Sequence, residues 1–139
     1  MLKIVYKGGY KYQLFETYEV PVSIHPQEHL AIDKFLELLT NGTLRIYKGY
    51  AWDGASGPAM DTKTIMRGAL IHDALYQLMR TGKLAQKWRK QADKDLFRVC
   101  LQDGMWRIRA YWVYRAVRIF AKKAAMAGME KRVETAPRE

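Results

Sequence analysis

The sequence of 139 residues has one cysteine, no long apolar run and few acidic residues, and each scarcity excludes a class of protein. The single cysteine, Cys100, excludes an internal disulfide, so nothing indicates an oxidising compartment. It sits in an apolar helical run, which favours a buried, inert thiol over a nucleophile. No stretch of roughly 18 uncharged apolar residues occurs, so we expect no transmembrane segment. The N-terminus, MLKIVYKGGYKYQ, lacks the apolar run of a signal peptide.

The chain has fewer acidic than basic side chains. It contains 14 Asp and Glu and 24 Lys and Arg, which gives a formal net charge of +10. Such an excess suits contact with phosphate, a membrane surface or an acidic polymer, and solubility alone also explains it. Apolar residues make up 49% of the chain, which favours a globular protein. The length predicts one domain over residues 1–128, with a flexible tail at 129–139.

Residues 2–24 are rich in Val, Ile, Tyr and Thr, which predicts strands with a hairpin turn at Gly8-Gly9. Over 27–39, apolar residues recur at near-helical spacing, which predicts a helix capped by Gly42. A short strand is predicted over 43–50. We therefore expect an α+β fold with a small N-terminal antiparallel sheet.

A tight loop and a helix follow, and they hold most of the polar residues that can do chemistry. In the loop, Asp53, Gly54 and Ser56 can direct carbonyls or amides inwards to form an ion or oxyanion site, although a structural turn explains the same residues. The apolar stripe that follows predicts a helix over Thr62–Met79, and Gly82 ends it.

A second helix is predicted from Leu84 or Ala85 to Gln102, where Asp103-Gly104 ends it, and the short link makes the two helices an antiparallel hairpin. With the turn near Lys83 and a rise of about 1.5 Å per residue, Asp93 or Asp95 falls level with His72 and Asp73. A facing carboxylate would fix the tautomer of His72, a candidate general base. The alternative is a buried polar cluster that clips the two helices together.

The final helix, predicted over Met105–Met126, is basic and aromatic. Its apolar side includes Trp106, Trp112 and Val113, and we expect it to pack on the core with the charges solvated. Such a helix can also lie on an anionic membrane or follow phosphates. The basic surface comprises Arg107, Arg109, Arg115, Arg118, Lys122 and Lys123.

Three motifs carry a resemblance to a known family: GYAWDGASGP at 49–58, IHDALY at 71–76, and Ala92-Asp93 with Phe97. Together they resemble the family catalogued as domain of unknown function thirteen fifty-three, which is found widely in tailed phages and prophages. A basic, aromatic final helix follows in that family too. This chain departs from the commoner pattern in an inserted helix before the loop and in Gly57 before the proline. Because the family lacks a settled activity, the resemblance implies a phage or prophage origin rather than a chemistry.

A second, looser resemblance concerns His72-Asp73-x-x-Tyr76, which looks like the active helix of secreted phospholipases A2 when Asp93 stands on the facing helix. In that family the histidine activates water, the adjacent aspartate binds calcium with loop carbonyls, and a second aspartate orients the histidine. The resemblance implies those three roles for His72, Asp73 and Asp93, with carbonyls from the loop at Asp53. The loop does not match that family's glycine-rich calcium loop, and the family's disulfides are absent, so the similarity does not indicate homology and leaves convergent geometry as an open alternative.

The leading hypothesis is a phage- or prophage-encoded hydrolase of a lipid ester or a cell-wall bond. His72 would be the base, beside Asp93 and Tyr76, and Asp73 and Asp53 would hold a divalent ion such as calcium. The alternative is a non-enzymatic accessory or virion-associated protein, in which His72, Asp73 and Asp93 form a structural network and the basic helix binds a virion or host protein, nucleic acid or a membrane. Either protein is expected in the host cytoplasm or in the virion.

Overall fold

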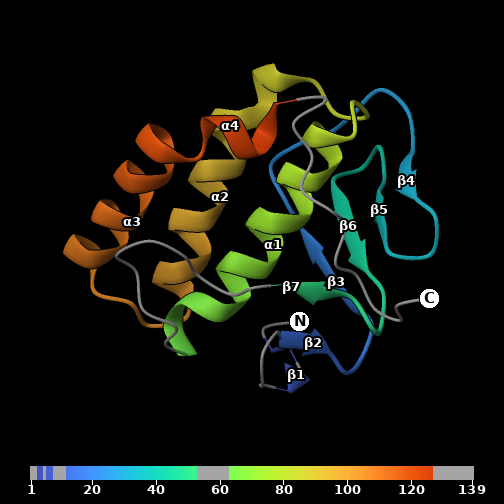
Figure 1. Cartoon of the computed structure of the whole chain (residues 1–139). Helices are drawn as coiled ribbons and strands as arrows, with labels where there is room; N and C mark the ends of the chain where they lie inside the picture. The colour runs from blue at the N-terminus through green and yellow to red at the C-terminus, as the bar shows by residue number, and fades with distance from the viewer. Residues whose placement is uncertain (1–2, 5, 8–11, 53–62, 127–139) are drawn as a thin grey trace.

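The structure is a computed structural model that describes residues 3–4, 6–7, 12–52 and 63–126. Two antiparallel sheets built from the N-terminal part of the chain are followed by helices that pack together beside them (Figure 1). The predicted α+β fold is therefore confirmed. No helix among the described residues is long and apolar enough to cross a membrane.

The sheets are small, and every pair of neighbouring strands is antiparallel. The first has the order β1-β2-β7, and the second has the order β3-β6-β5-β4. Their strands are β1 Tyr6–Lys7, β2 Tyr12–Leu14, β3 Tyr18–Pro21, β4 Leu30–Ile32, β5 Leu36–Leu38, β6 Thr43–Ile46 and β7 Ala51–Trp52. In β3, buried Tyr18 and Val20 alternate with exposed residues, so one face of the second sheet covers the core.

The predicted helix over residues 27–39 is wrong, because this segment forms the β4–β5 hairpin. β5 also pairs with β6, and that pairing places Leu36 and Leu38 in the core. Asp33 has a φ of 40° between the two strands, a conformation that Asp tolerates better than most residues. Gly42 has the predicted left-handed φ, 89°, but it lies between β5 and β6 rather than at a helix end. Apolar spacing cannot separate a short buried hairpin from a helix, so the long-range pairing decided the outcome.

The predicted helical hairpin is confirmed. α1 spans Lys63–Arg80, and a 3-10 turn at Gln86–Trp88 leads into α2, Arg89–Gln102. Gly82 and Gly104, predicted to end the two helices, have φ values of 80° and 99°. Such left-handed residues are common just after a helix because they let the last carbonyls find partners.

The final basic segment forms two helices, not the single helix predicted over 105–126. α3 spans Arg107–Phe120 and α4 spans Lys122–Ala125. The guanidinium of Arg89 donates to the main-chain oxygen of Arg118 at 2.8 Å, at the end of α3. A carbonyl that accepts from a side chain no longer needs the next turn of helix as its partner. This contact gives a physical reason for the break.

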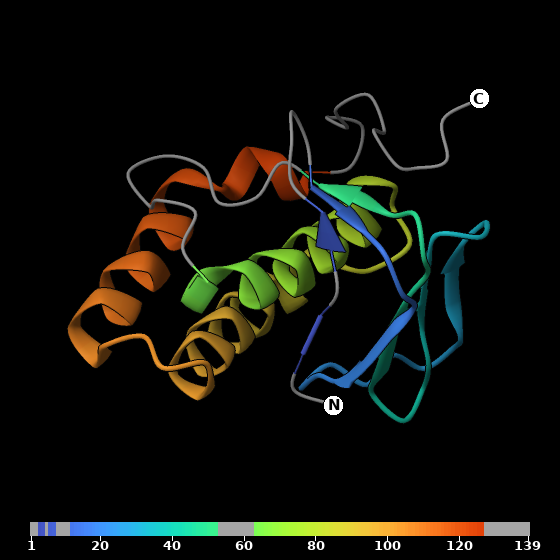
Figure 2. The same cartoon turned by 90° about the horizontal axis from the view of Figure 1, so that it is seen from below.

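α1 is the central helix of the fold. Lys63, Thr64, Asp73 and Arg80 are its only residues that are not buried. The four-stranded sheet covers one side of α1, while α2 and α4 lie against other sides (Figure 2). A side chain on α1 therefore points into the protein interior in almost every direction, and a polar one there requires a partner.

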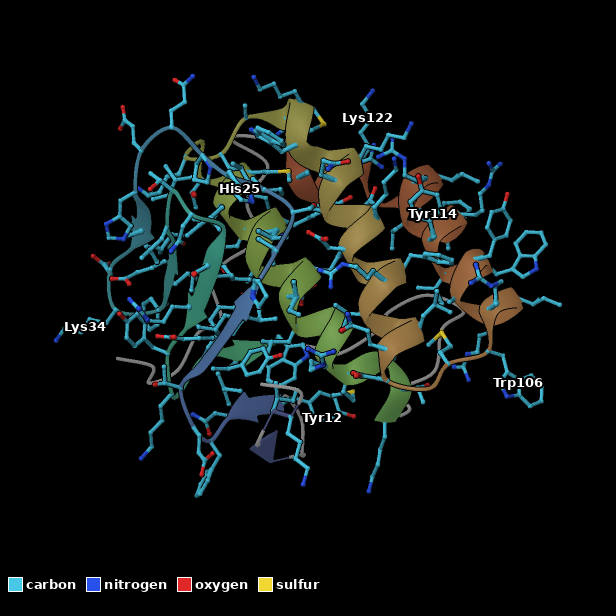
Figure 3. The ribbon with its side chains drawn as sticks, turned by 180° about the vertical axis from the view of Figure 1, so that it is seen from behind. Tyr12, His25, Lys34, Trp106, Tyr114 and Lys122 are labelled. Carbon is cyan, nitrogen blue, oxygen red and sulfur yellow. The ribbon has the colours of Figure 1, made fainter. Side chains whose placement is uncertain are left out.

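α3 packs on the core through small residues, and its largest apolar residues face solvent. Within this helix only Ala110 and Val113 are buried. The expectation that the apolar side packs on the core is therefore correct for Val113 and wrong for the large aromatic and aliphatic residues. Trp106, just before α3, projects from the outer edge of the molecule in Figure 3, where Lys34 lies at the opposite edge. The exposed members are Trp106, Ile108, Tyr111, Trp112, Ile119 and Phe120.

Candidate functional site

The site is centred on the Asp93 carboxylate, which is completely buried between α1, α2 and α3. Nε2 of His72 lies 2.7 Å from Oδ1 of Asp93. The hydroxyl of Tyr76 donates to the same oxygen at 2.6 Å. Nη1 of Arg118 donates to Oδ2 at 2.8 Å. The structure thus joins His72, Tyr76 and Asp93. The spacing on the two facing helices had placed Asp93 level with His72.

The electrostatics keep Asp93 ionised. Burial alone would raise the pKa of its carboxyl, but hydrogen bonds from His72, Tyr76 and Arg118 outweigh that penalty and hold the pKa below its usual value. Burial, with the hydrogen bond to Asp93, raises the pKa of Tyr76 well above its usual value, so Tyr76 stays a protonated donor. An ionised carboxylate can only accept hydrogen bonds, so Nε2 of His72 must carry a proton.

The second ring nitrogen of His72, Nδ1, is the candidate basic atom. Nε2 makes the contact with Asp93, and Nδ1 has no hydrogen-bond partner among the described residues. In a neutral imidazole with a protonated Nε2, Nδ1 is an acceptor and can take a proton. The ring lies 4.1 Å from that of Tyr76, centroid to centroid, and 9% of the side chain remains exposed. The contact with Asp93 therefore fixes the ring at Nε2 and leaves Nδ1 as the candidate acceptor.

Arg89 is a part of the site that the sequence analysis missed. Its Nε donates to the Tyr76 hydroxyl at 3.1 Å, and its Nη2 donates to the main-chain oxygens of Val117 and Arg118. The signal in the sequence is that Arg89 precedes Asp93 by four residues, so both lie on one face of α2. Arg89 therefore connects the buried tyrosine to the end of α3.

Asp95 lies outside this cluster, although it was predicted to be near His72. Its Oδ2 accepts hydrogen bonds from both the amide and the hydroxyl of Ser23, each at 3.0 Å. Its Oδ1 accepts from Arg98 at 3.1 Å. Asp95 points away from α1 because it is two residues, or about 200°, from Asp93 around the helix. Its observed role is to fasten the chain after β3 to α2.

A second buried cluster, also missed from the sequence, lies nearer the start of α1. Arg67 is 3% exposed, and its guanidinium donates to both carboxylate oxygens of Asp103. It also donates to the hydroxyl of Tyr18 at 2.7 Å and to the side chain of Gln102 at 2.8 Å. These contacts occupy four of the five N–H donors of Arg67, and the cluster joins α1, α2 and β3.

The described residues do not by themselves form a metal site. No group of three or more His, Cys, Asp and Glu side chains lies close enough for a metal within the part of the chain that the structure describes. Asp73 is half-buried on α1, next to His72. The loop residues Asp53, Gly54 and Ser56 lie outside the described residues. The calcium expected from the sequence therefore stays a prediction.

Only some of the residues of the predicted basic surface are exposed to solvent. Arg107, Arg115, Lys122 and Lys123 are exposed, whereas Arg109 and Arg118 are half-buried. The guanidinium of Arg118 forms an ion pair with the buried carboxylate of Asp93.

Comparison with known proteins gives no relative for this chain: no family model, curated protein or solved structure matches it. The resemblances to the phage-associated family and to the phospholipases A2 therefore stay predictions that rest on the motifs alone.

Proposed function

We propose that this protein is a small hydrolase of phage or prophage origin, in which His72 is the general base. The supporting observation is the 2.7 Å contact between Nε2 of His72 and the buried, ionised Asp93. Asp93 fixes the tautomer, so Nδ1 takes a proton from water as that water attacks the substrate. The imidazolium that forms would be stabilised by the same carboxylate. Asp93, Tyr76 and Arg118 are positioning residues, because they act through His72.

The substrate class that we propose is a lipid ester or a bond of the bacterial cell wall. Both reactions require an activated water molecule and a means to stabilise the negative charge that develops on oxygen. Asp73 follows the base on the same helix and is the described residue that would contribute a carboxylate to a divalent ion. The proposed proton transfer itself is assigned to His72.

The non-enzymatic alternative has one observation in its favour. Asp93 accepts hydrogen bonds from two helices besides its own, which is also what a structural clip would do. A clip stabilises the fold but needs no basic nitrogen on His72. The two functions therefore predict different effects on activity when the ring is replaced by a group that keeps only the hydrogen bond.

The variant His72→Gln makes that test, because the glutamine amide can donate to Asp93 in place of Nε2 and has no basic nitrogen. Fatty-acid release from phospholipid and solubilisation of peptidoglycan are measured for the wild type, His72→Gln and the exposed control His29→Gln. The proposal predicts that the wild type and His29→Gln hydrolyse one substrate, and that His72→Gln loses at least a hundredfold in rate. Equal activity in His72→Gln would overturn the assignment of the base.

A further inference from the structure

The outward face of α3 carries large apolar side chains that the described part of the fold leaves exposed. Ile108, Trp112 and Ile119 are separated by four and seven residues, so they form one stripe along the helix. Their exposed fractions are 75%, 65% and 58%. Trp106 and Phe120 extend the patch at the two ends of the helix. Single exposed apolar residues are ordinary, but several that share one face of a helix indicate a binding surface.

The charges around this stripe all have one sign. Arg115 lies along the same side of α3, four residues before Ile119, and Arg107 and Lys122-Lys123 mark the two ends. Each of these four basic residues is exposed. From Met105 to Gly128 the sequence contains no Asp or Glu. The surface is therefore both apolar and cationic, with no acidic side chain of its own segment to neutralise it.

We propose that α3 binds the surface of an anionic lipid bilayer, with its Ile108–Trp112–Ile119 stripe inserted at the level of the headgroups. Tryptophan and aliphatic residues flanked by Arg and Lys are the composition of helices that lie in the membrane interface. The basic residues would pair with lipid phosphates, and the apolar side chains of the stripe would be transferred from water into the membrane interface. This inference goes beyond the proposed hydrolase and does not depend on it.

The geometry permits such contact. α3 has 14 residues, so it is about 21 Å long, too short to span a bilayer but sufficient to lie along one. It forms the edge of the helical layer, with α2 between it and α1, and the four-stranded sheet lies at the other side of the molecule (Figure 2). A flat surface can therefore reach the stripe without displacing the core.

The same surface suits other partners less well. A second copy of the chain would bring two sets of Arg and Lys together with no acidic residue from this segment to oppose them. Nucleic acid would pair with the basic residues and could stack a base on Trp112, but it offers no apolar surface that would cover Ile108 and Ile119. An anionic bilayer satisfies both the apolar stripe and the positive charge.

The test uses the full-length chain with vesicles of phosphatidylcholine alone and of phosphatidylcholine mixed with phosphatidylglycerol. Co-sedimentation measures the partition coefficient, and tryptophan emission reports insertion. The double variants are Ile108→Ser/Ile119→Ser and Lys122→Gln/Lys123→Gln. The matched controls are Phe15→Ser, an exposed apolar residue outside α3, and Lys34→Gln/Lys83→Gln, which removes two exposed lysines elsewhere.

We expect binding to the anionic vesicles with a blue shift in emission, and much weaker binding to the neutral ones. The lysine variant should lose about fivefold per charge at low salt, and the isoleucine variant about tenfold or more. Both controls should bind like the wild type. The proposal is overturned if neither vesicle is bound, or if the α3 variants bind as well as the controls. A dimer dispersed by Ile108→Ser/Ile119→Ser, or binding to DNA without binding to vesicles, would also overturn it.

Discussion

Arg118 on α3 and Asp93 on α2 are joined by a hydrogen bond of 2.8 Å, from Nη1 to Oδ2. The carboxylate that holds His72 therefore also holds the C-terminal part of the helix whose outer face is apolar and basic. Arg89 strengthens the same connection, because it donates to Tyr76 and to the main-chain oxygens of Val117 and Arg118. The candidate base and the candidate membrane surface share one polar network.

The stability of the protein should decline in acid partly through Asp93. Its pKa is lowered in the folded state, so its contribution is complete above the unfolded value, about pH 4, and is lost as the pH falls through the lower folded value. At pH 7, Asp93→Asn should reduce the free energy of unfolding by about 1–3 kcal/mol. Urea denaturation at pH 7, 4, 3 and 2 should show the difference between the two proteins shrinking below pH 4. A difference that stays constant down to pH 2 would contradict the lowered pKa.

Tyr76→Phe should affect stability more than it affects the proposed chemistry. The change removes the 2.6 Å hydrogen bond to Asp93 and the acceptor for Arg89, at a cost of about 1 kcal/mol, while His72 keeps its contact with Asp93. We expect kcat within about tenfold of the wild type, because the general base remains. Denaturation and steady-state rates on the same preparation check this. If Tyr76→Phe were as inactive as His72→Gln, Tyr76 would have a direct role in the reaction.

A divalent ion should stabilise the protein if Asp73 is a metal ligand, as the sequence predicts. Binding to the folded state alone raises the melting temperature in proportion to RT ln(1 + [L]/Kd). Melts are recorded in EDTA and then with calcium, magnesium, manganese or zinc. The metal prediction expects an increase with one ion in the wild type and none in Asp73→Asn. Melting that is indifferent to every ion in both proteins would contradict a metal site, and the His72 proposal would stand without it.

Gly42 should tolerate alanine less well than Gly82 does, although both have left-handed φ values of 89° and 80°. An added Cβ at Gly42 would lie 2.9 Å from Nε2 of His25 and 3.0 Å from the main-chain oxygen of Val22. At Gly82 it would meet no atom within 4 Å among those described. Gly82→Ala should cost about 1–2 kcal/mol from the φ alone, and Gly42→Ala should cost more. Equal costs in denaturation would contradict the close packing of the turn.

The helical hairpin and its His72–Asp93 contact could be predicted because they depend on local regularities. Two long amphipathic helices joined by a short turn place residues equally far from that turn at one level. The β4–β5 hairpin could not be predicted in this way, since its three-residue strands form through long-range pairing: β5 pairs with β6, and β4 pairs with β5. Its apolar residues fit a helix equally well when the partner strand is unknown.

The sequence also predicted only part of the arrangement of the side chains on α3. An amphipathic pattern shows which face of a helix is apolar, but not whether another element covers that face. Here the small residues Ala110 and Val113 make the contact with the core, and Trp112 faces solvent. Arg118 was expected to lie on the basic surface, and only the three-dimensional arrangement shows that it reaches Asp93.

The most direct test of the central proposal is the rate of hydrolysis of phospholipid and peptidoglycan by the wild type and by His72→Gln, with the melting temperature of each protein recorded alongside. If His72 is the general base, the wild type hydrolyses one substrate, and the variant loses that activity while it melts within a few degrees of the wild type. If the wild type hydrolyses neither substrate and His72→Gln merely melts at a much lower temperature, the proposal is contradicted, and His72 and Asp93 are a structural clip between α1 and α2.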